Sequence, residues 1–228
     1  MPTGKQALRM TYLGNPEKLL KLLTQLWGGL GNTLFLFFAT LVLSLPLGLA
    51  VALLRRNQSP VLRAPISFYI LIMRGTPLIL QIFAIYFTIP LLLGHAFDRM
   101  SATVIAFVLN YAAYFAEIFR GGIDTVARGQ WEAGKALGMN RAQVFLKIIL
   151  PQVMRNVILP VSNEVITLVK DTALVTAVGI VDLYRAAKNA TSSSGSLEPL
   201  FIAGLVYLLL NTVVTWCFSQ LHRRAALP

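Results

Sequence analysis

The chain has 228 residues, of which 56% are hydrophobic and only 13% are charged, and its formal net charge at pH 7 is +11. Soluble globular domains carry about 25% charged residues, so this composition excludes an ordinary soluble domain and favours a protein that folds in a lipid bilayer. The one cysteine, Cys217, excludes internal disulfides and cysteine metal clusters. The sequence predicts neither a metal site nor a cofactor in this chain.

The basic residues predict membrane topology rather than nucleic-acid binding. They lie mostly between and beside long apolar runs, where Lys and Arg orient a membrane protein. The sequence shows no aromatic-basic surface or finger pattern, so we expect no nucleic-acid partner. No cleavable signal peptide is evident in residues 1–25.

Five apolar runs are long enough to be transmembrane helices, since a span takes about 20 apolar residues. They cover residues 26–54, 66–93, 101–119, 157–181 and 199–221. Pro77 interrupts the second run and disfavours helical geometry at Thr76, so we expect a kink or a broken helix there. Glu117 and Arg120, at the end of the third run, are spaced to pair across one helical turn. The predicted fold class is therefore an all-α integral membrane protein with about five transmembrane helices.

The two ends of the chain are expected to lie on opposite sides of the membrane. The segment 17–27 carries leucines at helical spacing, which indicates either an amphipathic surface helix within an N-terminal tail (1–25) or an early start of the first span. With that tail left out, the bias of Lys and Arg between loops places the N-terminus outside. The loop 120–150 and the C-terminal tail 222–228 then lie inside.

The loop at 120–150 predicts two short helices joined by a glycine turn. Three residues share one face of the first helix: Ala133, Ala136 and Leu137. Gly138 can adopt the left-handed conformation that ends this helix. Asn140 fits the N-cap of the second helix, with Gln143 placed three residues later as in a capping box.

This loop resembles the cytoplasmic signature of ABC importer permeases, which reads Glu-Ala-Ala, three residues, Gly, nine residues, Ile, one residue, Leu-Pro. The matching residues are Glu132, Ala133, Gly138, Ile148, Leu150 and Pro151. Gly129 precedes the signature, and Gly134 stands where the third residue is usually Ala. The resemblance implies that the loop is a short cytoplasmic coupling helix that docks on a separate ATPase subunit.

The flanking segments are similar to the polar amino-acid uptake branch of that family. They are Arg74-Gly75-Thr76-Pro77, Glu117-Ile118-Phe119-Arg120-Gly121-Gly122-Ile123, Gly129-Gln130 and Lys170-Asp171-Thr172-Ala173-Leu174. The resemblance covers about residues 26–221. It implies the type I importer permease fold in the cytoplasmic membrane and no enzymatic activity in this chain, because ATP and Mg²⁺ would bind the partner.

The same resemblance implies a set of partners for the chain. These are two ABC ATPase subunits, a second permease chain that is identical or related, an extracytoplasmic solute-binding protein, an amino-acid substrate and the lipid bilayer.

One pattern in the loop resembles a nucleotide-binding motif, since Gly129, Gly134 and Lys135 almost complete a phosphate loop. That loop needs a preceding strand and a Ser or Thr, where this chain has Ala136. We therefore predict no nucleotide binding here.

Polar groups inside membrane spans are costly and are candidates for a translocation pathway. The candidates are Arg74, Gln81, Asn110, Glu164, Lys170 and Asp171. Together they could bind the carboxylate and the ammonium of an amino acid. The same groups could instead pin helices together or reach a membrane face, and the sequence leaves both roles open.

Two other functions compete with an ATP-driven importer. A secondary transporter often shows inverted repeats, but five spans do not divide equally and no repeat is evident. An intramembrane enzyme needs a nucleophile or a metal constellation, and neither His-Glu-x-x-His nor Gly-x-Ser-x-Gly occurs. Dependence on an ATPase separates the importer from both alternatives.

Overall fold

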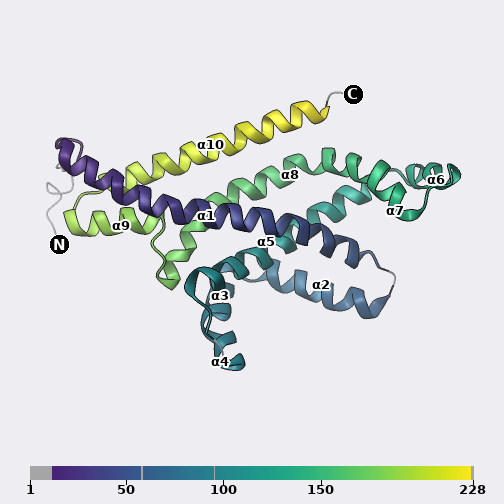
Figure 1. Cartoon of the computed structure of the whole chain (residues 1–228), viewed down its shortest axis with the longest axis horizontal. Coiled ribbons are helices and arrows are strands. Elements are labelled where there is room, and N and C mark those ends of the chain that lie inside the picture. Colours follow the sequence, from purple (N-terminus) through teal and green to yellow (C-terminus); the bar gives the residue numbers. More distant parts are fainter. Residues whose placement is uncertain (1–11, 58, 95, 227–228) are drawn as a thin grey trace. The chain divides into compact units, whose positions relative to one another are not determined.

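The structure is a computed structural model that describes residues 12–57, 59–94 and 96–226, and Figure 1 shows its helices in chain order. The α-helices are α1 (Pro16–Arg55), α2 (Pro60–Gly75), α3 (Leu78–Phe83), α4 (Ile89–Leu93), α5 (Arg99–Asp124), α6 (Arg128–Ala136), α7 (Arg141–Val144), α8 (Leu150–Asp171), α9 (Leu183–Ser194) and α10 (Glu198–Ala226). Two π-helical segments (Ala84–Thr88 and Phe145–Ile149) and a 3₁₀ segment (Thr172–Val178) join some of them. Parts of the predicted tails, residues 1–11 and 227–228, lie outside the described residues.

The long helices have the length and apolarity that membrane spans need. In the described residues these are Pro16–Arg55, Arg99–Asp124, Arg141–Val178 and Glu198–Ala225. Pro60–Gly75 and Leu78–Leu92 are bent by 112° relative to each other, and they make a fifth span if the pair is one broken span rather than a re-entrant loop. Thr76 between them has extended backbone (φ −122°, ψ 148°), which confirms the predicted interruption before Pro77. The segment 17–27 is continuous with the rest of α1 and does not form a separate helix.

Each π-helical segment ends two residues before a proline, Pro90 or Pro151. A proline ring in a helix clashes with the carbonyl four residues earlier, which here belongs to Tyr86 or Lys147. Both of those residues lie inside the π-helical segment, where the wider turn carries the carbonyl away from the ring. The helix therefore continues through Pro151 into α8 without a break.

Contacts divide the described chain into two compact units. The first contains the residues up to Thr40, Leu78–Phe107 and Thr167–Val213, and the second contains Leu41–Pro77, Val108–Ile166 and the residues from Val214 onward. In the first unit, Leu22 and Leu26 of α1 are buried with alanines of α9 and with Ala203 of α10. Figure 1 shows α9 beside the beginning of α1. Helix α9 is not among the predicted helices, because its run of Ser, Thr and Asn lacks the apolar periodicity of a span.

The turn before α9 is fixed by polar groups. Asp182 is fully buried and accepts hydrogen bonds from the amides of Tyr184 and Arg185, which caps the helix N-terminus. The Tyr207 hydroxyl donates to the same carboxylate (3.2 Å). Burial raises the pKa of the Asp182 carboxyl, and these hydrogen bonds oppose that shift. A Cβ on Gly29 would lie 2.5 Å from the Asp182 carbonyl oxygen, so this contact requires glycine in α1.

In the second unit, small residues allow close helix contacts. A Cβ on Gly48 of α1 would lie 2.7 Å from the Cβ of Phe115 and 3.0 Å from the carbonyl oxygen of Ala112 in α5. Gly122 of α5 packs in the same way against Val157 of α8. Small residues at helix contacts are typical of membrane bundles, where packing takes the place of the hydrophobic effect.

Many large apolar side chains are exposed, which suits lipid as the surrounding solvent. Examples more than half exposed are Trp27, Phe35, Phe38, Leu91, Phe201, Leu205 and Trp216. The single cysteine, Cys217, is also exposed, on α10. The distribution agrees with a chain whose long helices contact hydrocarbon.

Candidate functional site

The first helix of the predicted coupling loop, α6, ends as its sequence indicates. Gly138 has φ +73°, and the amide of Met139 donates to the Gly134 carbonyl (3.1 Å) while the amide of Gly138 donates to Lys135 (2.9 Å). This left-handed glycine closes the carbonyl end of the helix. The predicted glycine turn is confirmed.

The second helix, α7, begins with the predicted capping box. Asn140 Oδ1 accepts from the Gln143 amide, and Gln143 Oε1 accepts from the Asn140 amide, both at 2.9 Å. Two helix-terminal amides are thereby satisfied within four residues. The turn between α6 and α7 is thus fixed locally, independently of the spans.

Helix α6 packs one face against neighbouring residues, and its opposite face is exposed. On the inner face, Gly134 is buried against Val144 and Ile148, and the Trp131 ring stacks on Phe145 at 6.3 Å between centroids and 25° between planes. The outer face consists of Glu132, Ala133, Ala136 and Leu137, all exposed. Leu137 is 78% exposed, and with the exposed Ala133 and Ala136 it makes the apolar part of this face, in a loop that the sequence places outside the bilayer. The outer face can therefore bury apolar area against another protein.

The remaining signature residues connect the loop to the following span. Ile148 is half-buried and lies within the π-helical segment, and Leu150 and Pro151 begin α8. Gly129 is exposed in the first turn of α6, and no side chain lies within 4 Å of the Cβ that it lacks. The helix is therefore continuous from Arg141 in the loop into the span formed by α8.

A cluster of charges surrounds Glu117 in the second unit. The predicted pair with Arg120 is present (2.8 Å), and Glu117 also pairs with Arg55 of α1 and lies 3.9 Å from Arg74 of α2. Glu117 is 16% exposed, so one partly buried carboxylate meets three guanidinium groups from three helices. Sequence reasoning missed Arg55, although an arginine that ends a charge-free run is a signal that such a partner exists.

Arg74, one of the candidate pathway residues, is in contact with this cluster. Its guanidinium lies 5.3 Å from the centre of the Tyr114 ring, a cation–π distance. Asn110 of α5 is buried and donates to the carbonyl of Met73 (2.9 Å), next to Arg74. The structure therefore brings Arg74 and Asn110 to the same end of α2.

The other candidates divide between the two units. Glu164 is half-buried on α8 in the second unit. In the first unit, Gln81 is buried in α3, while Lys170 is exposed and Asp171 is half-buried at the end of α8. The described residues hold no group of three or more His, Cys, Asp or Glu that could hold a metal ion.

Residues 44–227 match the family described as binding-protein-dependent transport system inner membrane component. The chain belongs to this family. Its members are the membrane-spanning permease subunits of ABC importers, and ATP hydrolysis belongs to a separate subunit of the transport system. The near-match to a phosphate loop agrees with that division, because Gly129 and Gly134 of this permease both lie inside α6, whereas a phosphate loop precedes its helix.

Curated relatives cover most of the permease. The arginine transport system permease protein ArtQ of Bacillus subtilis is 38% identical over 86% of this chain and 90% of its own length. The octopine transport system permease protein OccM of Rhizobium radiobacter is 37% identical over 91% and 89% of the two chains. The L-cystine transport system permease protein TcyB of B. subtilis is 36% identical over 87% of each.

Solved structures share the fold of this permease. The crystal structure of an amino acid ABC transporter with histidines has a TM-score of 0.82 and 32% identity, covering 93% of this chain and 98% of that one. The MetNI methionine ABC transporter, in an inward-facing conformation, has a TM-score of 0.73 at 20% identity and shows the fold alone. The predicted type I importer permease fold is confirmed.

Proposed function

We propose that this permease carries a polar amino acid inward across the cytoplasmic membrane and that the outer face of α6 docks on its ATPase. The exposed face with Glu132 and Leu137 carries the proposal, because the turn behind it is fixed by Gly138 and the capping box at Asn140. The names of the relatives support the substrate class, since ArtQ is a permease of an arginine transport system and TcyB is one of an L-cystine transport system.

The proposed partners follow from the family. They are two ATPase subunits, a second permease chain and an extracytoplasmic solute-binding protein. The N-terminus lies outside and the C-terminus inside, so that the loop with Lys135, Arg141 and Lys147 meets the ATPase in the cytoplasm. A conformational change driven by ATP needs a connection between the ATPase contact and the spans. Helix α6 packs against Val144 and Ile148, and the helix that contains them continues from Arg141 into α8.

Coupling is tested by co-purifying the permease with the ATPase encoded beside it, using Glu132→Arg. Glu17→Arg is the matched control. Glu17 is also exposed, and its substitution makes the same change of charge in the first turn of α1. We expect Glu132→Arg to abolish association or substrate-stimulated ATP hydrolysis and Glu17→Arg to keep both. Gradient-driven uptake by the chain alone, without any ATPase, would refute the importer and favour a secondary transporter.

We further propose that Arg74 binds the substrate carboxylate. It is 43% exposed and lies at the edge of the Glu117 cluster, where guanidinium groups outnumber carboxylates. Asn110 holds the end of α2 through the Met73 carbonyl and therefore positions Arg74. Arg74→Lys keeps the charge but loses the planar fork, so uptake should show a raised KM with the complex intact.

The remaining candidates are proposed to line the pathway within their own units. They are Glu164 in the second unit and Gln81, Lys170 and Asp171 in the first. Each is tested by alanine substitution in the assembled complex, with uptake kinetics and substrate preference as the readout. Unchanged kinetics and preference would assign that residue to helix packing instead.

A further inference from the structure

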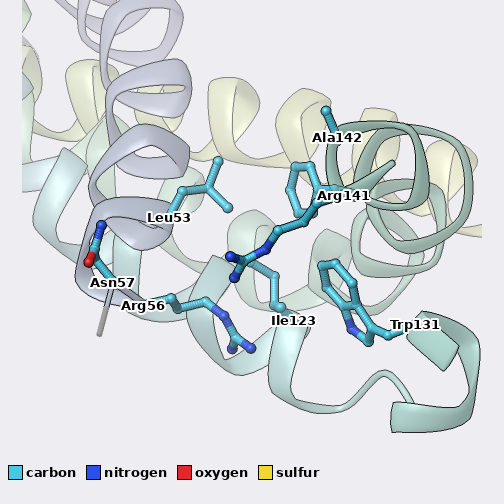
Figure 2. Close-up of a pocket in the computed structure, with 8 residues that line it drawn as sticks. Leu53, Arg56, Asn57, Ile123, Trp131, Arg141 and Ala142 are labelled. Carbon is cyan, nitrogen blue, oxygen red and sulfur yellow. The ribbon is translucent and has the colours of Figure 1, made fainter. Parts of the chain in front are cut away.

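A pocket of about 540 Å³ lies in the second unit beside the coupling loop. Its lining residues are Leu53, Arg56, Asn57, Ile123, Trp131, Arg141, Ala142 and Phe145. They come from the end of α1 and the two residues after it, from the end of α5, from α6 and α7, and from the first residue of the π-helical segment Phe145–Ile149. Figure 2 shows the guanidinium groups of Arg56 and Arg141 pointing into the same space, with Ile123 and the Trp131 ring beside them.

The two arginines are not equally neutralised. Arg56 pairs with Asp124, whereas Arg141 makes no salt bridge within the described ranges. A neighbouring cavity of about 340 Å³ is also lined mainly by positive groups, with Asp124 as the one carboxylate among its lining residues Arg55, Arg56, Asn57, Arg63, Arg120 and Asp124. Like charges in a partly enclosed pocket repel, and an anion between them would relieve that repulsion.

The pocket lies where the spans end. The apolar helices α1 and α5 end at Arg55 and Asp124, directly next to lining residues Arg56 and Ile123. That level in a membrane is occupied by lipid headgroups, and Trp and Arg are both favoured there. Leu53 and the Trp131 ring add apolar surface, against which the start of an acyl chain or the glycerol can pack.

We propose that this pocket binds the phosphate group of an anionic phospholipid, with Arg141 and Arg56 as its ligands. Guanidinium groups bind phosphate oxygens through paired charge-assisted hydrogen bonds. Basic pockets at the cytoplasmic ends of spans suit anionic headgroups, because the cytoplasmic leaflet supplies them at high local concentration. A bound lipid would then hold α1 and α5 against the coupling loop.

The observations favour a lipid over a carboxylate of the ATPase. The apolar part of the outer face of α6, which is Ala133, Ala136 and Leu137, is not among the residues that line the pocket. The pocket is instead lined from α6 by Trp131, on the inner face. Glu132 of the same face does line an adjacent cavity of about 720 Å³ together with Arg56 and Arg141. The apolar residues of the outer face therefore stay free for the ATPase while the arginine pair binds a phosphate, and Glu132 lies next to both contacts.

The test is lipid titration of the purified full-length permease in neutral detergent, followed by native mass spectrometry. Phosphatidylglycerol is compared with phosphatidylcholine of the same acyl chains. Arg141→Gln removes a guanidinium without leaving a carboxylate unpaired, so it should fold. Arg155→Gln is the control, since Arg155 is exposed on α8 and does not line the pocket.

We expect phosphatidylglycerol to bind more tightly than phosphatidylcholine. Losing one charge-assisted contact should weaken phosphatidylglycerol binding about tenfold in Arg141→Gln and leave Arg155→Gln within about twofold of wild type. Equal binding of the two lipids, or equal effects of the two substitutions, would overturn the proposal. Displacement of the lipid by millimolar inorganic phosphate would assign the pocket to a soluble anion. Weakened ATPase association in Arg141→Gln, with lipid binding unchanged, would assign it to the partner protein.

Discussion

Replacing Gly134 by alanine should loosen the coupling loop, although alanine is the usual residue at that signature position. The new Cβ would lie 2.7 Å from Cγ2 and 3.0 Å from Cγ1 of Val144, and 3.2 Å from Cδ1 of Ile148. Val144 is 1% exposed and sits in a helix, where a β-branched side chain has one strongly preferred χ1 rotamer. Its methyl groups therefore cannot rotate away, and α6 must move.

Two opposing terms set the size of the effect. Overpacking in a filled core costs about 1–3 kcal/mol. Replacing glycine by alanine inside a helix stabilises the helix by about 1 kcal/mol. The net loss is therefore about 1 kcal/mol, which corresponds to local opening of α6 that is about fivefold more frequent. Gly129→Ala should stabilise the helix in the same way without a steric clash, because nothing lies within 4 Å of the added Cβ.

Hydrogen exchange of the α6 amides in the detergent-purified chain measures this opening directly. Exchange should be about fivefold faster in Gly134→Ala and equal or slower in Gly129→Ala. Adding Val144→Ala to Gly134→Ala removes both clashing methyl groups and should restore protection. If the α6 amides exchange no faster in Gly134→Ala than in wild type, close packing is not the reason for glycine at this position.

Three further predictions concern the caps and the charged groups. Asn140→Ala removes the capping box and should destabilise α7 by about 1 kcal/mol, measured by hydrogen exchange at its first amides. Glu117→Gln leaves Arg55 and Arg74 without a carboxylate, while Arg120 keeps Asp124 (2.9 Å), and the change should cost about 2 kcal/mol in reversible unfolding in mixed micelles. Asp124→Asn, at a site 47% exposed, should cost under about 1 kcal/mol. The pKa of Asp182 is raised in the folded state, so its protonated form is favoured and its stabilising contribution is fully present below its unfolded pKa of about 3.9. That contribution is lost as the pH rises through the folded pKa, and Asp182→Asn keeps the cap. The stability of wild type relative to the Asn variant should therefore fall as the pH rises from 4, and a difference that does not vary with pH would contradict the shift.

Features set by neighbouring residues were predictable from the sequence. The left-handed turn at Gly138, the capping box at Asn140 and the pair Glu117–Arg120 depend on residues three or four apart, and each is present in the structure. The interruption at Thr76 follows from the ring of the next residue. Steric and hydrogen-bonding rules of this kind need no knowledge of the tertiary fold.

Features that join distant segments were not predictable in the same way. Glu117 meets Arg55 across 62 positions of the chain, and no local pattern selects that arginine over its neighbour Arg56. The stacking of Trp131 on Phe145 was also not predictable, because the sequence pattern shows Phe145 only as one of several apolar residues in a helix. The translocation residues remain predictions for a related reason, since several of them belong to different compact units.

The exposed thiol of Cys217 on α10 gives this permease a built-in spectroscopic handle, because the sequence contains no second cysteine. A nitroxide attached there labels one place in each copy of the chain without any engineered substitution. Two identical copies in one transporter would then show a single dipolar coupling between electron spins. A transporter that pairs this chain with a related but different one, labelled only on this chain, would show none. Subunit composition can therefore be determined on the unaltered protein.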